Sequence, residues 1–329
     1  MKKNVFFLVV FWIASLSVIT SQTRIIGFPE ILNATTSIAS GDTLYVAGGS
    51  NLLVGDSVSN GTKLDLISGK ADLSFPSVNN TINTVIADGA GGWYIGGTFT
   101  QVGAEARNGL ARINADGTLH TWNPNAGDSP NITSMLLVGN GKVYILSEGG
   151  RLGTIGGVNN LTYLAAVDAQ TGAVDASFNP VFNYHIHAIA ISATTLYVGG
   201  GWNSDGYLGA FDLASQTLKT GWTPSIVGGR VYSLAVSGNT LYVGGNFLKV
   251  KGTGDDTEQN RSYACAFDAT TGALNSWKSL ITKSGGSVPS VNVLVADPVN
   301  DLLYVGGAFD AIMGDWDNLS YDGLAAYKL

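Results

Sequence analysis

A short motif recurs six times along the chain, in which apolar residues around a tyrosine lead into a pair of glycines. The tyrosines of the six copies are Tyr45, Tyr94, Tyr144, Tyr197, Tyr242 and Tyr304. A period of roughly 45 to 60 residues is typical of solenoids, repeat arrays and propellers. We therefore number six repeats by these tyrosines and expect the repeat, rather than any local signal, to determine the fold.

Each repeat contains four short runs of β-favouring residues separated by turns rich in Gly, Asn, Asp, Ser and Thr. In the fourth repeat these runs are 187–191, 196–200, 208–212 and 218–222. Such a pattern predicts a four-stranded antiparallel meander, and no window shows a sustained helical period.

The fourth run of most repeats ends in an aromatic residue closely followed by proline, as in Trp222-Thr223-Pro224. Proline cannot donate to a β-ladder, which fits an edge strand. The last repeat lacks its fourth run, whereas 24–30 carries the same aromatic–proline signature. Pairing 24–30 with 324–329 would complete the last repeat. We predict an all-β fold, a six-bladed β-propeller of four-stranded antiparallel blades closed by the N-terminal strand 24–30. A seventh, degenerate blade would have to lie within 246–292.

The Tyr-x-Gly-Gly-x-Phe pattern at Tyr94–Phe99, Tyr242–Phe247 and Tyr304–Phe309 resembles the delta-sixty-type repeats of secreted bacterial β-propellers, which are Kelch-like. The segment 164–180 resembles them too, and the similarity covers essentially all of 24–329. This resemblance implies a propeller in an extracytoplasmic setting. It implies no common enzymatic activity, so no catalytic residue is transferred. The third copy departs from the pattern, with Leu146-Ser147-Glu148 where two glycines are usual.

The N-terminus has the pattern of a secretory signal peptide: a basic start, an apolar run over 5–19, and small residues at 20–21. We predict a signal peptide over 1–21 and a single propeller domain over 22–329, secreted or otherwise extracytoplasmic. An uncleaved membrane anchor is the alternative. No later segment could cross a bilayer, so no membrane span is expected after removal of the signal.

Composition excludes some partners. Charged residues make up 12% of the chain, glycines number 44, and the net charge is −7 without a basic cluster. This balance indicates a globular, turn-rich chain and argues against nucleic acid as a partner. The single cysteine, Cys265, lies in an apolar run and is predicted to be a small core residue.

One position recurs in the first strand of every repeat and is expected to face the centre of the ring. It is occupied by Thr35, Asn83, Thr133, His187, Tyr232 and Asn292. All six can form hydrogen bonds and none carries a formal charge. They could receive a sugar or peptide group, or they could line a hydrated channel mouth. Trp202 and Trp316 lie in loops and are predicted to stack on a ligand, with core packing as the alternative.

Three groups of residues carry side chains that could bind a metal ion. Asp315, Asp317 and Asp322 lie in one long loop and could bind calcium, as could the acidic segment 255–258, although solvated loops explain both. His185 and His187 are spaced to share one face of a strand. A zinc or copper site needs a third ligand, and the remaining histidine, His120, lies in another repeat.

We therefore expect a secreted binding or scaffold module that recognises a protein partner or a surface polysaccharide through loops on one face. The candidate loops are 50–63, 99–109, 201–207, 246–262 and 309–322. No cofactor is expected, except that calcium is possible. No Gly-x-Ser-x-Gly motif is present, which favours a non-enzymatic role. A self-assembling surface component and a polysaccharide lyase or hydrolase remain the alternatives.

Overall fold

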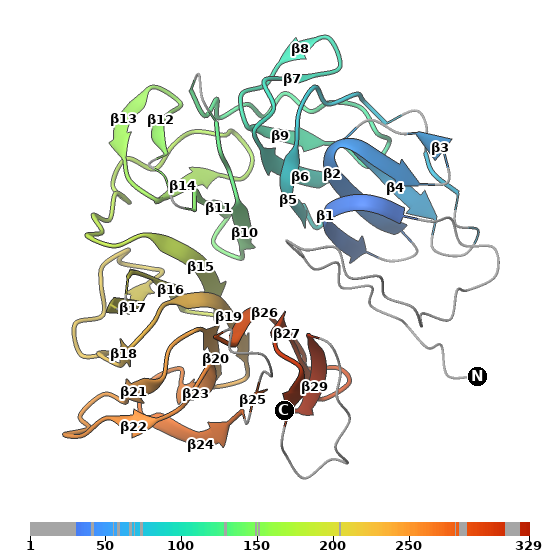
Figure 1. Cartoon of the computed structure of the whole chain (residues 1–329). Coiled ribbons are helices and arrows are strands. Elements are labelled where there is room, and N and C mark those ends of the chain that lie inside the picture. The colour runs from blue at the N-terminus through green and yellow to red at the C-terminus, as the bar shows by residue number, and fades with distance from the viewer. Residues whose placement is uncertain are drawn as a thin grey trace. The chain divides into compact units, whose positions relative to one another are not determined.

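The computed structural model is all-β. It describes residues 31–40, 43–54, 56–57, 60–65, 68, 70–72, 75–127, 130–148, 150, 152–203, 205–279, 281–282, 288–312 and 323–329. These residues form antiparallel sheets and contain no helix (Figure 1). The predicted fold class is therefore confirmed at the level of antiparallel β-sheets. The predicted signal peptide and the predicted strand 24–30 lie outside the described residues.

The chain divides into two compact units. The first ends at Asn179 and the second begins at Pro180, except that 138–140 and 148–150 belong to the second. That 22–329 forms a single domain stays a prediction.

The first three repeats build the sheets of the first unit. The first repeat consists of β1 (Ile31–Ser40), β2 (Thr43–Val54), β3 (Asp56–Ser57) and β4 (Gly61–Asp65). The second consists of β5 (Ile82–Ala87), β6 (Trp93–Gly97) and β9 (Leu110–Ile113), with a small hairpin of β7 (Gln101–Val102) and β8 (Glu105–Ala106). The third consists of β10 (Ser134–Val138), β11 (Lys142–Leu146) and β14 (Leu164–Asp168), with a small hairpin of β12 (Gly153–Ile155) and β13 (Val158–Leu161).

The remaining repeats build the second unit. The fourth consists of β15 (Ile186–Ile191), β16 (Thr195–Trp202) and β17 (Asp205–Asp212). The fifth consists of β19 (Val231–Ser237), β20 (Thr240–Gly245), β23 (Ala264–Asp268) and β24 (Leu274–Lys278). The sixth consists of β26 (Ser290–Asp297), β27 (Leu302–Ala308) and β29 (Leu324–Lys328). The short strands are β18 (Ser225–Val227), β21 (Lys249–Lys251), β22 (Gln259–Asn260), β25 (Ile281–Thr282) and β28 (Ala311–Ile312).

The fourth run is a regular strand only in the fifth repeat, where it forms β24. In the first four repeats it makes a single bridge to the third strand or, in the first repeat, to β4: Leu64↔Ala71, Ile113↔Leu119, Val167↔Val174 and Phe211↔Leu218. The strand predicted over 218–222 is therefore wrong in length. The terminal aromatic residue of the run packs against the tyrosine of the second strand, both where the run makes a single bridge and in the fifth repeat, where it forms β24.

That contact recurs in five repeats and joins the two strongest sequence signatures. The centroid separations of the ring pairs are 5.1 Å for Tyr45–Phe75, 5.0 Å for Tyr94–Trp122, 5.2 Å for Tyr144–Phe178, 5.5 Å for Tyr197–Trp222 and 5.2 Å for Tyr242–Trp277. Pairs at this separation contribute about 0.5–1.5 kcal/mol beyond the apolar area they bury. The aromatic residue before the proline is thus a core residue of its own repeat.

Neighbouring repeats within a unit are joined by the tyrosine and the glycines of the motif. The Tyr94 and Tyr197 hydroxyls donate to the carbonyls of Ala169 and Ala269 in the following repeat, each at 2.6 Å. A Cβ at Gly199 would lie 2.5 Å from Val231 Cγ1 in the next repeat, so only glycine permits this approach. The predicted core residue Cys265 is fully buried, and its burial is confirmed.

In the first, fourth and fifth repeats, the linker after the fourth run pairs with the next repeat. Val78 bridges to Val102, β18 pairs with β21, and β25 pairs with β28. At the start of the described chain, Ile31 and Leu32 pair in the same way with the end of β2. The first residues of β1 therefore occupy the position that these linkers occupy in their repeats.

Candidate functional site

Three of the predicted ligand-binding residues belong to one cluster in the second unit. The rings of His187 and Tyr232 are 5.8 Å apart, and those of His185 and His187 are 6.4 Å apart. His185 in turn packs edge-on against Trp202 at 4.3 Å. The cluster therefore runs Trp202–His185–His187–Tyr232. It brings together residues of the fourth and fifth repeats.

The positions of His187 and Tyr232 have a common structural cause. Each lies at a register shift in the first strand of its repeat, between Ile186 and Ala188 in one case and between Val231 and Ser233 in the other. Such a β-bulge adds one unpaired residue to a strand and changes the direction of its side chain. Register shifts in β1, β5 and β26 also fall at Thr35, Asn83 and Asn292. The recurring position found in the sequence is thus a recurring bulge.

Trp202 differs from the residues at the same position in the other repeats. Its register position holds phenylalanine in three other repeats, and Phe99, Phe247 and Phe309 are buried there. The Trp202 side chain is 51% exposed instead. The reason is that β16 continues directly into β17, with Trp202 paired to Asp205 near the tip of this hairpin. Core packing, the alternative considered for Trp202, is therefore wrong.

Glu148 completes the cluster and was missed as a site residue in the sequence. Its Oε1 lies 2.8 Å from His187 Nδ1. The His187 side chain is only 8% exposed, whereas that of Glu148 is 49% exposed. His187 Nε2 is buried and has no hydrogen-bond partner among the described residues. One sequence signal could have identified Glu148: it lies in the third copy of the motif, which lacks the two glycines.

His185 has a different environment from His187. Burial lowers the pKa of His185, and the neighbouring His187 and Arg230 lower it further. The Arg230 side chain is held near the cluster by a hydrogen bond from its Nε to the Asn203 carbonyl at 3.4 Å. His185 precedes β15, which begins at Ile186, yet its carbonyl accepts a hydrogen bond from Gly201 N at 2.8 Å and its ring lies 6.4 Å from that of His187.

Two other residues predicted to surround the centre, Asn83 and Thr133, belong to the first unit. Asn83 donates from Nδ2 to the Ile132 carbonyl at 3.0 Å, and Thr133 Oγ1 donates to the Leu146 carbonyl at 3.2 Å. Both contacts lie within the first unit. Asn292 is exposed on β26, and the side chain of Thr35 is outside the described set. Asn83 and Thr133 therefore support the fold locally.

No group of three or more His, Cys, Asp or Glu residues in the described part of the chain is arranged to hold a metal ion. In the acidic segment 255–258, Asp255 accepts a hydrogen bond from Gly252 N at 2.8 Å, and Glu258 pairs with Lys249 at 3.1 Å. His120 accepts a hydrogen bond from Trp122 N through Nδ1. Asp315, Trp316, Asp317 and Asp322 lie outside the described residues, so calcium binding at that loop stays a prediction.

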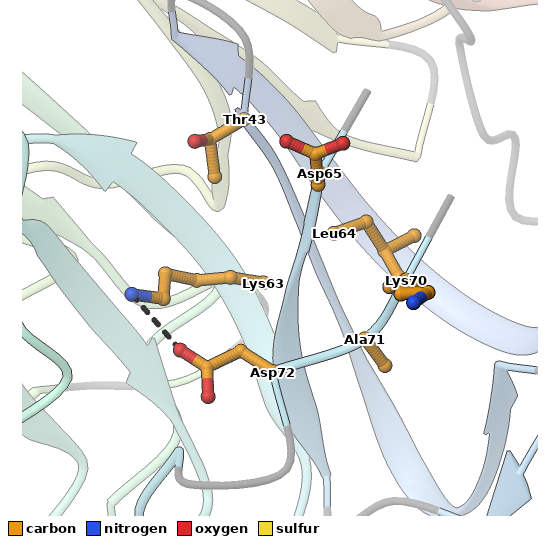
Figure 2. A pocket seen from close by; sticks show the side chains of 7 residues that line it. All are labelled: Thr43, Lys63, Leu64, Asp65, Lys70, Ala71 and Asp72. Atoms are coloured by element: carbon orange, nitrogen blue, oxygen red, sulfur yellow. Dashed lines mark ion pairs between the residues drawn. The ribbon is translucent and has the colours of Figure 1, made fainter. Parts of the chain in front are cut away.

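A pocket of about 280 Å³ opens in the first repeat beside β4 (Figure 2). Its lining residues are Thr43, Lys63, Leu64, Asp65, Lys70, Ala71 and Asp72. Lys63 pairs with Asp72 at 3.0 Å and also donates to the Ala115 carbonyl at 3.1 Å. Asp65 accepts a hydrogen bond from Ser68 N at 2.6 Å. Lys63, Asp65 and Asp72 thus already have protein partners, and we assign no function to this pocket.

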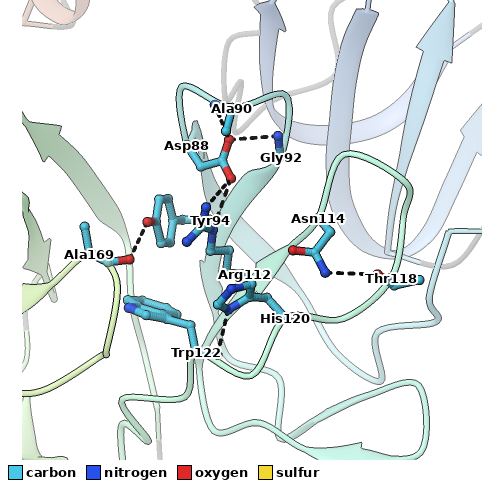
Figure 3. Close-up of polar contacts among 10 residues, drawn as sticks. All are labelled: Asp88, Ala90, Gly92, Tyr94, Arg112, Asn114, Thr118, His120, Trp122 and Ala169. Atoms are coloured by element: carbon cyan, nitrogen blue, oxygen red, sulfur yellow. Dashed lines mark hydrogen bonds and ion pairs between the residues drawn. The ribbon is translucent and has the colours of Figure 1, made fainter.

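In a buried ion pair of the second repeat, both carboxylate oxygens of Asp88 accept hydrogen bonds (Figure 3). Arg112 donates from Nε and Nη2 to Asp88 Oδ2 at 3.0 and 2.7 Å, while Ala90 N and Gly92 N donate to Asp88 Oδ1 at 2.8 Å. Burial raises the pKa of Asp88, but these hydrogen bonds outweigh it and hold the pKa below its ordinary value. Arg112 also lies over the Tyr94 ring at 5.3 Å. The pair has the geometry of a structural contact.

Comparison with known proteins adds little to this picture. No family model matches the chain, and no curated protein matches it in sequence. The fold is similar to the extracellular domain of BT4673 from B. thetaiotaomicron, with a TM-score of 0.46 and 15% sequence identity. The match covers 75% of this chain, which spans 28% of the length of that one. The described residues include no helix that is long and apolar enough to cross a membrane.

Proposed function

We propose that the chain is an extracytoplasmic six-bladed β-propeller that acts as a binding module for a surface polysaccharide. The N-terminal signal-like segment and the resemblance to secreted propeller repeats support the location. The six repeats and the contacts that join neighbours within each unit support the architecture, because stacked repeats need one recurring interface. The His187 cluster supports the binding role.

Closure of the ring is proposed from the two ends of the described chain. Ile31 and Leu32 pair with Val54 and Leu53 as the linkers that follow fourth runs do elsewhere. The outer edge of β29 ends its sheet in the described residues, and Leu324 is 43% exposed, whereas third strands such as β9 are fully buried. Residues 24–30 would supply the fourth run of the sixth repeat. Phe28 would then pack against Tyr304.

Substitution of Phe28 tests this closure. If Phe28 packs like Phe178, Phe28→Ala should destabilise the protein by about 3–5 kcal/mol, as removal of a buried aromatic side chain does elsewhere. Thermal unfolding of both variants measures this, with Val299→Ala as a control because Val299 is 90% exposed. A Phe28→Ala variant as stable as the wild type would contradict the proposed closure.

One observation supports the binding role most strongly: two residues that differ from the repeat pattern both belong to the His187 cluster. Trp202 is exposed where other repeats bury phenylalanine, and Glu148 stands where the motif departs from glycine. Both are linked to the His187 cluster, Trp202 through His185 and Glu148 through His187 itself. Exposed aromatic rings with a few placed polar groups suit an amphipathic ring such as a sugar, whose faces are apolar and whose edge carries hydroxyls.

A glycan array probed with the purified protein, with and without calcium, tests this function. We expect saturable binding to a polysaccharide, at least tenfold weaker in Trp202→Ala and in His187→Ala. Leu248→Ala is the matched control, because Leu248 is 47% exposed in the same unit and lies outside the cluster. Binding unaffected by Trp202→Ala and His187→Ala would reject this site.

The alternatives predict other results in the same preparation. Capture of one protein through Trp202, with no glycan bound, would favour a protein partner. Release of new reducing ends from a bound glycan would favour an enzyme. Assembly into large particles without ligand, measured by sedimentation, would favour a structural surface component.

A further inference from the structure

Glu148 is the one acidic residue at its position in the repeat. The residue four places after the motif tyrosine is Gly49, Thr98, Gly201, Asn246 and Ala308 in the other five repeats. The same copy replaces the two glycines by Leu146 and Ser147, which are both buried. A carboxylate is therefore introduced at a point where the repeat itself requires none.

The carboxylate determines which nitrogen of His187 carries the proton. An ionised carboxylate only accepts hydrogen bonds, so the 2.8 Å contact from Glu148 Oε1 requires a proton on His187 Nδ1. In the neutral ring, Nε2 then presents a lone pair. Carboxylates orient histidine rings in the same way behind metal ions. Here Nε2 is buried and has no partner in the described part of the protein.

A buried acceptor without a partner is costly until a donor reaches it. Its surroundings restrict which donor can do so. The ring of Tyr232 lies on one side and that of His185 on another, with Trp202 beyond His185. Among the described side chains, Glu148 contacts His187 and Arg230 acts on His185. A phosphate or carboxylate would bring a second anion toward Glu148 and no proton for Nε2.

We propose that the ligand of this site is a neutral saccharide, and that Glu148 selects it by holding His187 with Nε2 as an acceptor for a sugar hydroxyl. His187 is then the specificity-determining residue, and Glu148 is a positioning residue. This inference rests on the proposed function, whose site it uses.

The first test is spectroscopic and needs no ligand. The chain has three histidines, His120, His185 and His187, so ¹⁵N-histidine NMR of the purified protein gives few signals, and His187→Gln identifies those of His187. We expect a protonated Nδ1 and an unprotonated Nε2. Glu148→Gln should shift this pattern, because an amide can donate to Nδ1 as well as accept from it. A proton on Nε2 in the wild type would overturn the proposal.

The second test uses neutral hexose oligomers and the matching hexuronate oligomers as probes. We expect the wild type to prefer the neutral probes. Glu148→Gln should weaken their binding about tenfold and reduce the preference, since a hydrogen bond to a charged group is lost. Glu258→Gln is the matched control, because Glu258 is 41% exposed and pairs with Lys249. A preference for hexuronates that is lost in Trp202→Ala would overturn this inference and leave the proposed function standing. No binding to either class would overturn both.

Discussion

Two acid–base pairs in this protein differ in how completely they are satisfied. In the second repeat, Asp88 accepts four hydrogen bonds, two from Arg112 and two from backbone amides. In the second unit, Glu148 satisfies only one nitrogen of His187 and leaves the other buried without a described partner. A saturated buried network stabilises a fold, whereas an unsaturated one stores a cost that a ligand can remove. The comparison therefore separates a structural pair from a candidate binding pair.

The largest effect is expected from breaking the saturated pair. Arg112→Met leaves the buried Asp88 carboxylate without its counter-charge, so the free energy of unfolding should fall by about 3–5 kcal/mol. Lys328→Met is the control, because the Lys328–Asp301 pair is 3.8 Å long with both side chains more than half exposed. It should change stability by less than about 1 kcal/mol. If denaturant unfolding shows the same loss of stability in Arg112→Met and Lys328→Met, the Asp88–Arg112 pair contributes no more than an exposed ion pair.

A smaller effect is expected at the tyrosines that join repeats. Tyr94→Phe removes the donor to the Ala169 carbonyl and should cost about 1–3 kcal/mol. Tyr45→Phe is the matched variant, because the Tyr45 hydroxyl is buried with no hydrogen-bond partner in the described set. It should be neutral or stabilising. A loss of equal size in both variants would show that the hydroxyl contact between repeats contributes nothing.

Acid should weaken the saturated pair in a defined direction. The pKa of Asp88 in the folded state lies below the ordinary value of 3.8, so ionised Asp88 adds stability above that value. This contribution is lost as the pH falls through the lower folded pKa. We expect urea unfolding to show declining stability below about pH 4, and Asp88→Asn to reduce the slope. Some decline should remain in Asp88→Asn. Asp168 and Asp268 also have lowered pKa values, because they accept hydrogen bonds within their own turns. An unchanged slope would contradict the role of Asp88.

The smallest effect on stability is expected in the binding cluster. Trp202→Ala should change the free energy of unfolding by no more than about 0.5 kcal/mol, since the side chain is half exposed. Phe247→Ala removes a buried ring at the same repeat position and should cost about 3–5 kcal/mol. If thermal unfolding shows similar losses of stability in the two variants, Trp202 is packed as a core residue. The contrast between the binding cluster and the core would then not hold.

Much of the local structure could be predicted from the sequence. The motif tyrosines, the strands around them and the burial of Cys265 follow from periodicity and side-chain chemistry. The fourth runs were predicted as strands, because their composition favours β-structure, yet most pair at a single residue. Composition does not reveal that Trp222 and Phe178 pack against the tyrosines of their own repeats. The recurring position of His187 was found from its register, although its cause, a β-bulge, is a property of strand pairing.

The sequence by itself determined the all-β class, the number of repeats, and the position from which His187 and Tyr232 project. These depend on short-range patterns, and such patterns survive in a linear chain. Only the tertiary structure decided that Glu148 meets His187, that His185 lies between His187 and Trp202, and that Arg112 is neutralised by Asp88. Glu148 and His187 are 39 residues apart, and Asp88 and Arg112 are 24 apart. Contacts over such separations depend on how bulges, hairpins and buried rings pack together, which no single repeat encodes.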